Sequence, residues 1–278
     1  MASRRPGMAI ITISRGSFAG GNALAQCLAQ RLGFPALSRE QLLQQTARDF
    51  GISETELAGA LDATPPFWQQ MPGKRLAYVK AVTAVLLEHV RAGKLIYHGY
   101  VGHLLLSGID SVLRVRLIAD MEYRIRAAME AMRLSREAAI AHIQKVDKAR
   151  SRWARFLYGV DWEDPSQYDV VLHLGRVTVE GACSVVAMMS QLEEFAPTAQ
   201  SQKRLEDLSL SCRVWAALAK NPDTRSAAIN VTADGGQVVL SGAVGSNRCI
   251  EQISRIAAGV EGVKSVRSEL TVGADWYW

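Results

Sequence analysis

The sequence has few cysteines, no paired-cysteine motif and no long apolar run. Its four cysteines, Cys27, Cys183, Cys212 and Cys249, are widely scattered, and none belongs to a C-x-x-C pair. This spacing excludes the usual zinc-binding and thioredoxin-like redox motifs. Cys27 and Cys183 lie in apolar helical contexts, where we expect them to be core residues. No segment reaches the roughly 18 to 20 apolar residues that a membrane-spanning helix needs.

The N-terminal segment also lacks the features of a secretory signal. Residues 1–6 carry charge, but the apolar strand that follows breaks off at Ser14 and Arg15. This arrangement does not match the charged and apolar regions of a signal peptide. We therefore expect a cytoplasmic protein.

The bulk composition is that of a globular protein with a mild excess of basic residues. Hydrophobic residues make up 49% and charged residues 21% of 278 positions, which allows one or two domains with their own cores. The formal net charge is +5. That balance fits either an ordinary solvated surface or a surface for polyanions such as nucleotides, nucleic acid or acidic lipid. Several arginines between residues 114 and 155 favour a local anion site.

The most informative segment is an apolar strand followed by a glycine-bearing turn and an apolar-periodic helix. The strand covers 8–14, the turn ends at Gly20, and the helix covers 21–33. This order is typical of a phosphate-binding P-loop, whose backbone N–H groups surround a phosphate at the start of a helix. The Walker A sequence is incomplete, because Gly21 replaces its Lys and Ala23 its hydroxyl residue. A plain strand-turn-helix without a ligand is the alternative interpretation.

Strands and helices alternate through the first two thirds of the chain. Capping boxes at Ser38 and Ser53 predict helices that start near residues 39 and 54. Asp120, Ser135 and Thr178 are expected to cap later helices. The expected strands cover 8–14, 94–99, 112–118 and 169–174, and a long helix covers 74–92. The alternation predicts an α/β fold, with a parallel sheet and helices on both of its faces.

The pattern changes at a polar stretch over residues 197–202. Beyond it we expect a helix, two strands joined at Asp234-Gly235-Gly236, a second helix and a final strand. Their approximate ranges are 203–220, 229–232, 238–242, 247–258 and 263–272. The order αββαβ predicts a small α+β domain. We place the two domains at 1–198 and 199–278, and expect the first to fold alone because the linker is polar.

Further motifs accompany the glycine turn in the first domain. They are Ser14-Arg15, Asp147-Lys148-Ala149-Arg150, and Phe156 to Pro165 followed by Tyr168-Asp169. With these motifs, residues 8–192 resemble the cytidylate-kinase-like family of nucleoside monophosphate kinases. The resemblance implies a P-loop kinase fold, ATP and Mg²⁺ as cofactors, and phosphate transfer to a nucleoside monophosphate, CMP above all. It also implies a nucleotide, and not a nucleic acid, as the partner.

Within this resemblance, candidate site residues lie in the loop and in a helical lid. Arg124, Arg150 and Arg155 are the lid candidates, because guanidinium groups match phosphate oxygens. Asp147 would orient Arg150, three residues on; the alternative for each arginine is a solvated helix charge. We expect no metal ligands from the protein, since Mg²⁺ is held largely by phosphate oxygens and waters. The loop residues expected to hold the nucleotide phosphates, with Arg15 as substitute for the missing Lys, are Arg15, Gly16, Ser17, Ala19, Gly20, Gly21 and Asn22.

Three positions depart from the pattern of that family. Phe18 stands where a loop glycine is expected. Ser38 stands where an Asp usually follows the second short strand, and Tyr100 where Gly-Arg would follow the third strand. In the family, these last two positions help to place the acceptor nucleotide.

The second domain carries a paired signature at 236–242 and 259–266, and ends in Leu270-Thr271-Val272. These segments resemble the BON domain, a small module usually associated with bacterial envelope proteins and thought to bind phospholipid or other ligands. The resemblance implies a lipid, a small ligand or a protein as the partner of this domain.

Three functional hypotheses remain open at this stage. The favoured one is an ATP-dependent nucleoside monophosphate kinase, supported by the loop and the lid segment. The second is a catalytically impaired nucleotide-binding protein whose BON-like domain engages a partner, supported by Phe18, Gly21, Ala23, Ser38 and Tyr100. The third is an assembly scaffold in which the domains form a homo-oligomer.

Overall fold

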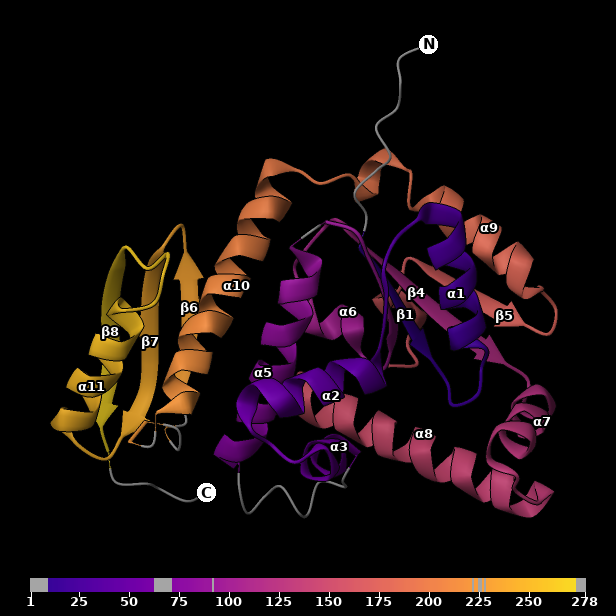
Figure 1. Cartoon of the computed structure of the whole chain (residues 1–278), viewed down its shortest axis with the longest axis horizontal. Helices are drawn as coiled ribbons and strands as arrows, with labels where there is room; N and C mark the ends of the chain where they lie inside the picture. The colour runs from indigo at the N-terminus through magenta and orange to yellow at the C-terminus, as the bar shows by residue number, and fades with distance from the viewer. Residues whose placement is uncertain are drawn as a thin grey trace, which may run out of the picture. The chain divides into compact units, whose positions relative to one another are not determined.

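The chain folds into two compact units, shown in the computed structural model of Figure 1. The structure describes residues 10–62, 72–91, 93–221, 223–224, 227 and 229–273. The described part of the first unit comprises 10–42, 61–62 and 90–198. That of the second comprises 43–60, 72–89 and the chain from 199 onward. None of the helices in the described part is long and apolar enough to cross a membrane.

The first unit is built on a five-stranded parallel sheet, as the alternation of elements predicts. The strand order is β2-β3-β1-β4-β5, and every neighbouring pair is parallel. The central strands are almost wholly buried, as expected where helices cover both faces of a parallel sheet. The strands are β1 (Ile10–Arg15), β2 (Ala36–Ser38), β3 (Leu95–Gly99), β4 (Val112–Ala119) and β5 (Val170–Leu174).

The helices begin close to the positions predicted from their caps. Ser38 accepts from the Gln41 N–H at 3.1 Å and the Gln41 side chain accepts from the Ser38 N–H at 2.9 Å, a complete capping box. Ser135 and Thr178 cap their helices as predicted. Asp120 stands at the N-cap of its helix as predicted, but its side chain makes no capping hydrogen bond and lies 3.3 Å from His173 instead. The helices to residue 189 are α1 (Gly21–Leu32), α2 (Arg39–Phe50), α3 (Glu54–Asp62), α5 (Pro72–Val90), α6 (Gly102–Leu105), α7 (Met121–Met132), α8 (Arg136–Tyr158) and α9 (Val179–Met189).

Two of these helices, α1 and α9, lie side by side (Figure 1). Their apolar faces form one core with the central strands, in which Leu24 and Leu28 pack with Val186. Cys27 of α1 and Cys183 of α9 are joined in a disulfide. The sequence predicted them only as core residues, because nothing in the spacing of cysteines 156 positions apart indicates that their helices are neighbours.

The second unit contains the predicted small α+β sheet. Its order is β6-β7-β8, with β6 and β7 antiparallel and β7 and β8 parallel. Gly235 and Gly236 have φ of 58° and 97°, which suits the predicted hairpin turn. The predicted linker ends earlier than expected: Ala199 to Gln202 are already helical, because no proline or glycine follows Pro197 to prevent it. The elements are α10 (Ala199–Lys220), β6 (Ile229–Asp234), β7 (Gln237–Val244), α11 (Asn247–Ala258) and β8 (Ser265–Val272).

This second core also includes residues from much earlier in the chain. Ala81 of α5 is fully buried in the same cluster as Val214, Leu240 and Ile253. Phe50, at the end of α2, lies 6.2 Å from Trp215 between ring centroids. The unit is therefore assembled from segments on both sides of residue 198.

Because the core of the second unit contains residues from before and after residue 198, we expect a different result for a fragment of residues 1–198. We expect this fragment to expose the apolar faces of α5 and α2, and so to bind the dye ANS and melt over a broader range than the full chain. Dye fluorescence and thermal unfolding followed by circular dichroism would measure both effects. A fragment that melts cooperatively without binding the dye would show that the polar linker alone decides the boundary.

Candidate functional site

The candidate site is a cavity at the end of β1, where the loop over residues 16–20 leads into α1. Gly20 is the N-cap of α1 with φ of 78°, and no side chain caps the helix. The first N–H groups of α1 thus have no capping side chain, as an anion site at a helix start requires. The cavity has a volume of about 550 Å³. It is lined by Arg15, Ser17, Phe18, Gly20, Gly21, Asn22, Ala23, Glu40, Tyr123, Ala127, Ala131, His142, Val146 and Arg150.

Arg15 occupies the space that a side chain at position 21 would need. A Cβ added to Gly21 would lie 2.6 Å from Arg15 Nε and 3.1 Å from its Cγ. Burial, the largest influence, lowers the pKa of Arg15, and the Glu40 carboxylate opposes that effect. Arg15 Nε is buried with no hydrogen-bond partner among the described residues. The glycine found at the Walker Lys position therefore makes room for a buried cation that comes from the strand.

Ser17 is held by the helical hairpin of α7 and α8. Asp147 of α8 accepts from the Ser17 N–H at 3.2 Å and from Ser17 Oγ at 2.9 Å. Arg124 of α7 pairs with the same carboxylate and donates from Nε to the Ser17 carbonyl at 2.7 Å. Its guanidinium also packs on Gly16, where an added Cβ would be 3.3 Å from Arg124 Cζ. These partners of Asp147 were not predicted from the sequence, which paired it with Arg150.

Of the two other lid candidates, the structure brings Arg150 to the loop but not Arg155. Arg150 Nη1 lies 3.3 Å from the Arg15 carbonyl and 3.4 Å from Ser17 Oγ. Arg155 is exposed, pairs with Asp161 at 2.6 Å and does not line the cavity. Five residues of α-helix turn the side chain well away from that of Arg150, which accounts for the difference.

Phe18 is a cavity residue whose role the sequence did not reveal. Its backbone is in the left-handed region with φ of 59°, which is rare for a bulky residue and is a conformation that glycine adopts readily. Its ring meets His142 of α8 edge-on at 5.9 Å between centroids. Tyr123 and Glu40 also line the cavity, and no motif in the sequence indicated them.

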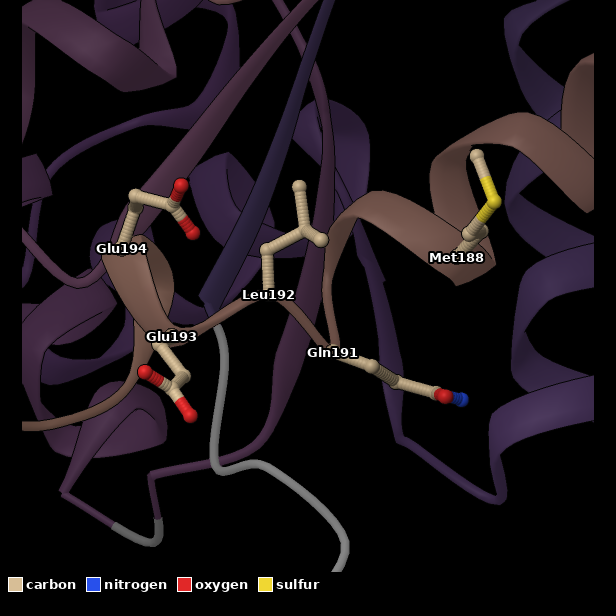
Figure 2. A pocket seen from close by; sticks show the side chains of 5 residues that line it. All are labelled: Met188, Gln191, Leu192, Glu193 and Glu194. Carbon is tan, nitrogen blue, oxygen red and sulfur yellow. The ribbon is translucent and has the colours of Figure 1, made fainter.

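A second hollow in the same unit does not fit an anion. Figure 2 shows its lining residues, which come from the end of α9 and the turn after it. Glu193 and Glu194 give this hollow a negative charge, and Met188 and Leu192 are exposed apolar side chains. A phosphate would be repelled here, so the cavity at the glycine loop is the candidate site.

The described residues contain no group of three His, Cys, Asp or Glu side chains that could hold a metal ion. Ser17, which lines the cavity, donates from Oγ to the Asp147 carboxylate at 2.9 Å. A hydroxyl with a carboxylate is a donor set that Mg²⁺ uses when phosphate oxygens complete its shell. The residues present therefore fit a nucleotide-bound Mg²⁺ better than an ion held by protein alone.

The packing of Arg15 on Gly21 gives a direct test of the loop. We expect Gly21→Ala to displace the Arg15 side chain and to lower the free energy of unfolding by about 1–3 kcal/mol. In an Arg15→Ala background the same change should have little effect, because the colliding atoms are gone. Urea unfolding of the unmodified chain, Gly21→Ala, Arg15→Ala and the double variant measures how far the effects of the two substitutions on the free energy of unfolding depend on each other.

Gly59→Ala is the matched control for that test. Gly59 lies within α3, has ordinary helical φ, and an added Cβ would meet nothing within 4 Å. Alanine there should be neutral or stabilising by about 0.5–1 kcal/mol. Equal stability of Gly21→Ala and the unmodified chain would contradict the packing described above.

Comparisons with known proteins give a family for each of two segments of the chain. Residues 10–176 match the model of the Cytidylate kinase-like family, and residues 207–274 match the BON domain. A cytidylate kinase of Natronomonas pharaonis is 25% identical over 190 residues, which cover 68% of this chain and 91% of that protein. A cytidylate kinase of Thermococcus kodakarensis is 22% identical over 201 residues, which cover 72% and 97%.

A solved structure shows the same fold without adding functional information. It is an uncharacterized protein from Eubacterium ventriosum, with 19% identity and a TM-score of 0.51, covering 66% of this chain and 98% of that one. This likeness concerns the fold of the first unit, and the match to the BON domain concerns residues 207–274. This chain belongs to the cytidylate kinase-like family.

Proposed function

We propose that the protein transfers the terminal phosphoryl group of ATP to a nucleoside monophosphate, with CMP as the acceptor. The observation that carries the proposal is the convergence of Arg15 and Arg150 on one glycine loop, beside Ser17, in a cavity that a phosphate chain can enter. The family supports the reaction class. CMP is proposed because the relatives described above are named cytidylate kinases.

In this proposal the loop holds the phosphates of ATP. The N–H groups of Gly16, Ser17 and Ala19 donate within the chain, to Leu117, Asp147 and Gly16. Those of Gly20, Gly21 and Asn22 are therefore proposed to surround the anion at the start of α1. The buried guanidinium of Arg15 supplies the charge that the Walker Lys supplies elsewhere. Mg²⁺, bound with the nucleotide, would add charge neutralisation, and Ser17 with Asp147 are the residues that would hold it.

The transfer itself needs positioning and charge stabilisation. A phosphate oxygen of the monophosphate attacks the terminal phosphorus of ATP, and a P–O bond forms as the bond to the bridging oxygen breaks and ADP leaves. Arg150, held above Ser17, stabilises the charge on the transferred group. Arg124 fixes Asp147 and the loop backbone. Arg155 is proposed to act only through its contact with Asp161 at the end of the lid.

The proposal also covers the division of the chain, the role of the BON domain and the cellular location. We assign the reaction to residues 1–198 and partner binding to 199–278, while the core of the second unit also includes segments before residue 198. The BON domain is proposed to bind a lipid, a small ligand or a protein, or to join copies of the chain in a homo-oligomer. A cytoplasmic location is part of the proposal because nucleoside monophosphate kinases act on cytoplasmic nucleotides.

A second candidate is a nucleotide-binding regulatory protein without catalysis. One observation favours it: the Asp147 carboxylate already accepts from the Ser17 N–H, which a loop phosphate would otherwise use. If that contact persists with nucleotide bound, ATP would bind without being cleaved. Product formation separates this candidate from the kinase.

We expect Arg150→Ala to lower the rate of diphosphate formation at least a hundredfold, since the variant loses about 3 kcal/mol of transition-state stabilisation. The measurement is the steady-state rate with Mg-ATP and a panel of CMP, UMP, AMP and GMP. Arg152→Ala is the matched control, because Arg152 is an exposed arginine of the same helix that does not line the cavity. It should keep the rate of the unmodified chain.

Two outcomes would count against the kinase. Transfer by Arg150→Ala at the unmodified rate would remove this arginine from the mechanism. ATP binding without a diphosphate product from any acceptor would favour the regulatory candidate.

A further inference from the structure

Tyr100, which stands after β3 where the resemblance predicts Gly-Arg, is buried beneath α8. Its exposed fraction is 5%. Its ring lies 5.7 Å from that of Trp153 on α8 and 5.4 Å from that of Trp162 just beyond α8, measured between centroids. Two large aromatic side chains thus hold the Tyr100 ring in one orientation.

The hydroxyl of Tyr100 reaches the backbone of α8. It donates to the carbonyl of Arg150, and the backbone of Ala154 also interacts with this hydroxyl. The hydroxyl therefore contacts the backbone of α8 in the turn between Arg150 and Ala154. Burial raises the pKa of Tyr100, so the hydroxyl keeps its proton and remains a donor at neutral pH.

The ring of Tyr100 also contacts the guanidinium group of Arg150. The guanidinium carbon lies over the ring, 5.6 Å from its centroid, within range of a cation–π interaction. From there Nη1 reaches the Arg15 carbonyl and Ser17 Oγ at 3.3 and 3.4 Å. One tyrosine thus contacts both the backbone and the charged group of Arg150.

The turn that places Tyr100 is strained. Val101 has φ of 53°, a conformation that is a genuine outlier for a β-branched residue. Gly102 follows in close contact with Tyr97, where an added Cβ would lie 2.5 Å from Cε1. Strain of this kind persists where the surrounding structure requires one geometry. Here that geometry puts Tyr100 under α8.

We propose that Tyr100 is the positioning residue for Arg150. It fixes the guanidinium above the loop before nucleotide binds, so that the charge needs no rearrangement when the phosphoryl group is transferred. This inference rests on the proposed function, because it assigns Arg150 a ligand in the phosphate cavity. It also gives a physical role to the tyrosine at position 100, where the resemblance predicts Gly-Arg.

The test is Tyr100→Phe, alone and with Arg150→Ala, in the full chain. Phenylalanine keeps the ring and removes the hydroxyl, so α8 loses its link at the Arg150 carbonyl. We expect kcat to fall about tenfold, because small misplacements of a catalytic group lower the rate. KM for ATP and CMP should stay within about twofold. In the Arg150→Ala background, Tyr100→Phe should cause no further loss.

A second readout follows Arg150 without relying on activity. In protein labelled with ¹⁵N-arginine, the Nε–H signal of Arg150 is assigned by its loss in Arg150→Ala. Tyr100→Phe should shift and broaden this signal, although the ring itself is retained. Tyr168→Phe is the matched control: it removes another buried hydroxyl, which donates to the Trp162 carbonyl at 2.6 Å, and should leave the signal unchanged.

The outcomes distinguish this inference from the proposed function. A full rate in Tyr100→Phe, or a further loss in the Arg150→Ala background, would overturn the positioning role while the kinase stands. If the unmodified chain transfers no phosphate but the Arg150 signal responds to Tyr100→Phe, the kinase fails and the positioning role stands. An unchanged signal would overturn the positioning role in either case.

Discussion

The packing of Arg15 across Gly21 is the contact on which the site depends. A side chain at position 21 would collide with Arg15, so the loop cannot hold both this arginine and a Walker Lys. The cation therefore enters from β1, below the loop, and not from α1. A buried guanidinium needs a counter-charge nearby, because burial disfavours its charged form. Glu40 supplies part of that charge, and a phosphate chain in the cavity would add to it, although the sequence motif of the loop is incomplete.

The hairpin of α7 and α8 carries the rest of the site, and the structure ties it to the loop at several points. Asp147 and Arg124 bind Ser17, Phe18 packs on His142, and Tyr100 holds the α8 backbone. A helix that moved freely as a lid would position Arg150 only after nucleotide arrives. Contacts from both the loop and β3 favour an arrangement formed in advance, and such preorganisation is what phosphoryl transfer requires of a protein.

The fold was predictable because local signals and the global arrangement agree. Capping boxes such as that of Ser38 with Gln41 fixed helix starts, and buried apolar strands indicated the parallel sheet. The failures concern contacts between distant segments. No local pattern pairs Cys27 with Cys183, gives Asp147 the partner Ser17, or places Ala81 of α5 in the second core. The five-residue spacing of Arg150 and Arg155 already indicates that the two do not share one face of a helix, and the structure separates them. The strained backbone at Phe18 was visible in the sequence only as an unusual residue at an expected glycine position.

The central claim is that this loop, without a Lys, supports phosphoryl transfer. The most direct measurement is a ³¹P NMR time course of the full chain with Mg-ATP and CMP. The account predicts the loss of the ATP β-phosphate signal as the β-phosphate signals of ADP and CDP grow in equal amounts. An ATP spectrum that stays unchanged, under conditions where ATP is shown to bind, would contradict it.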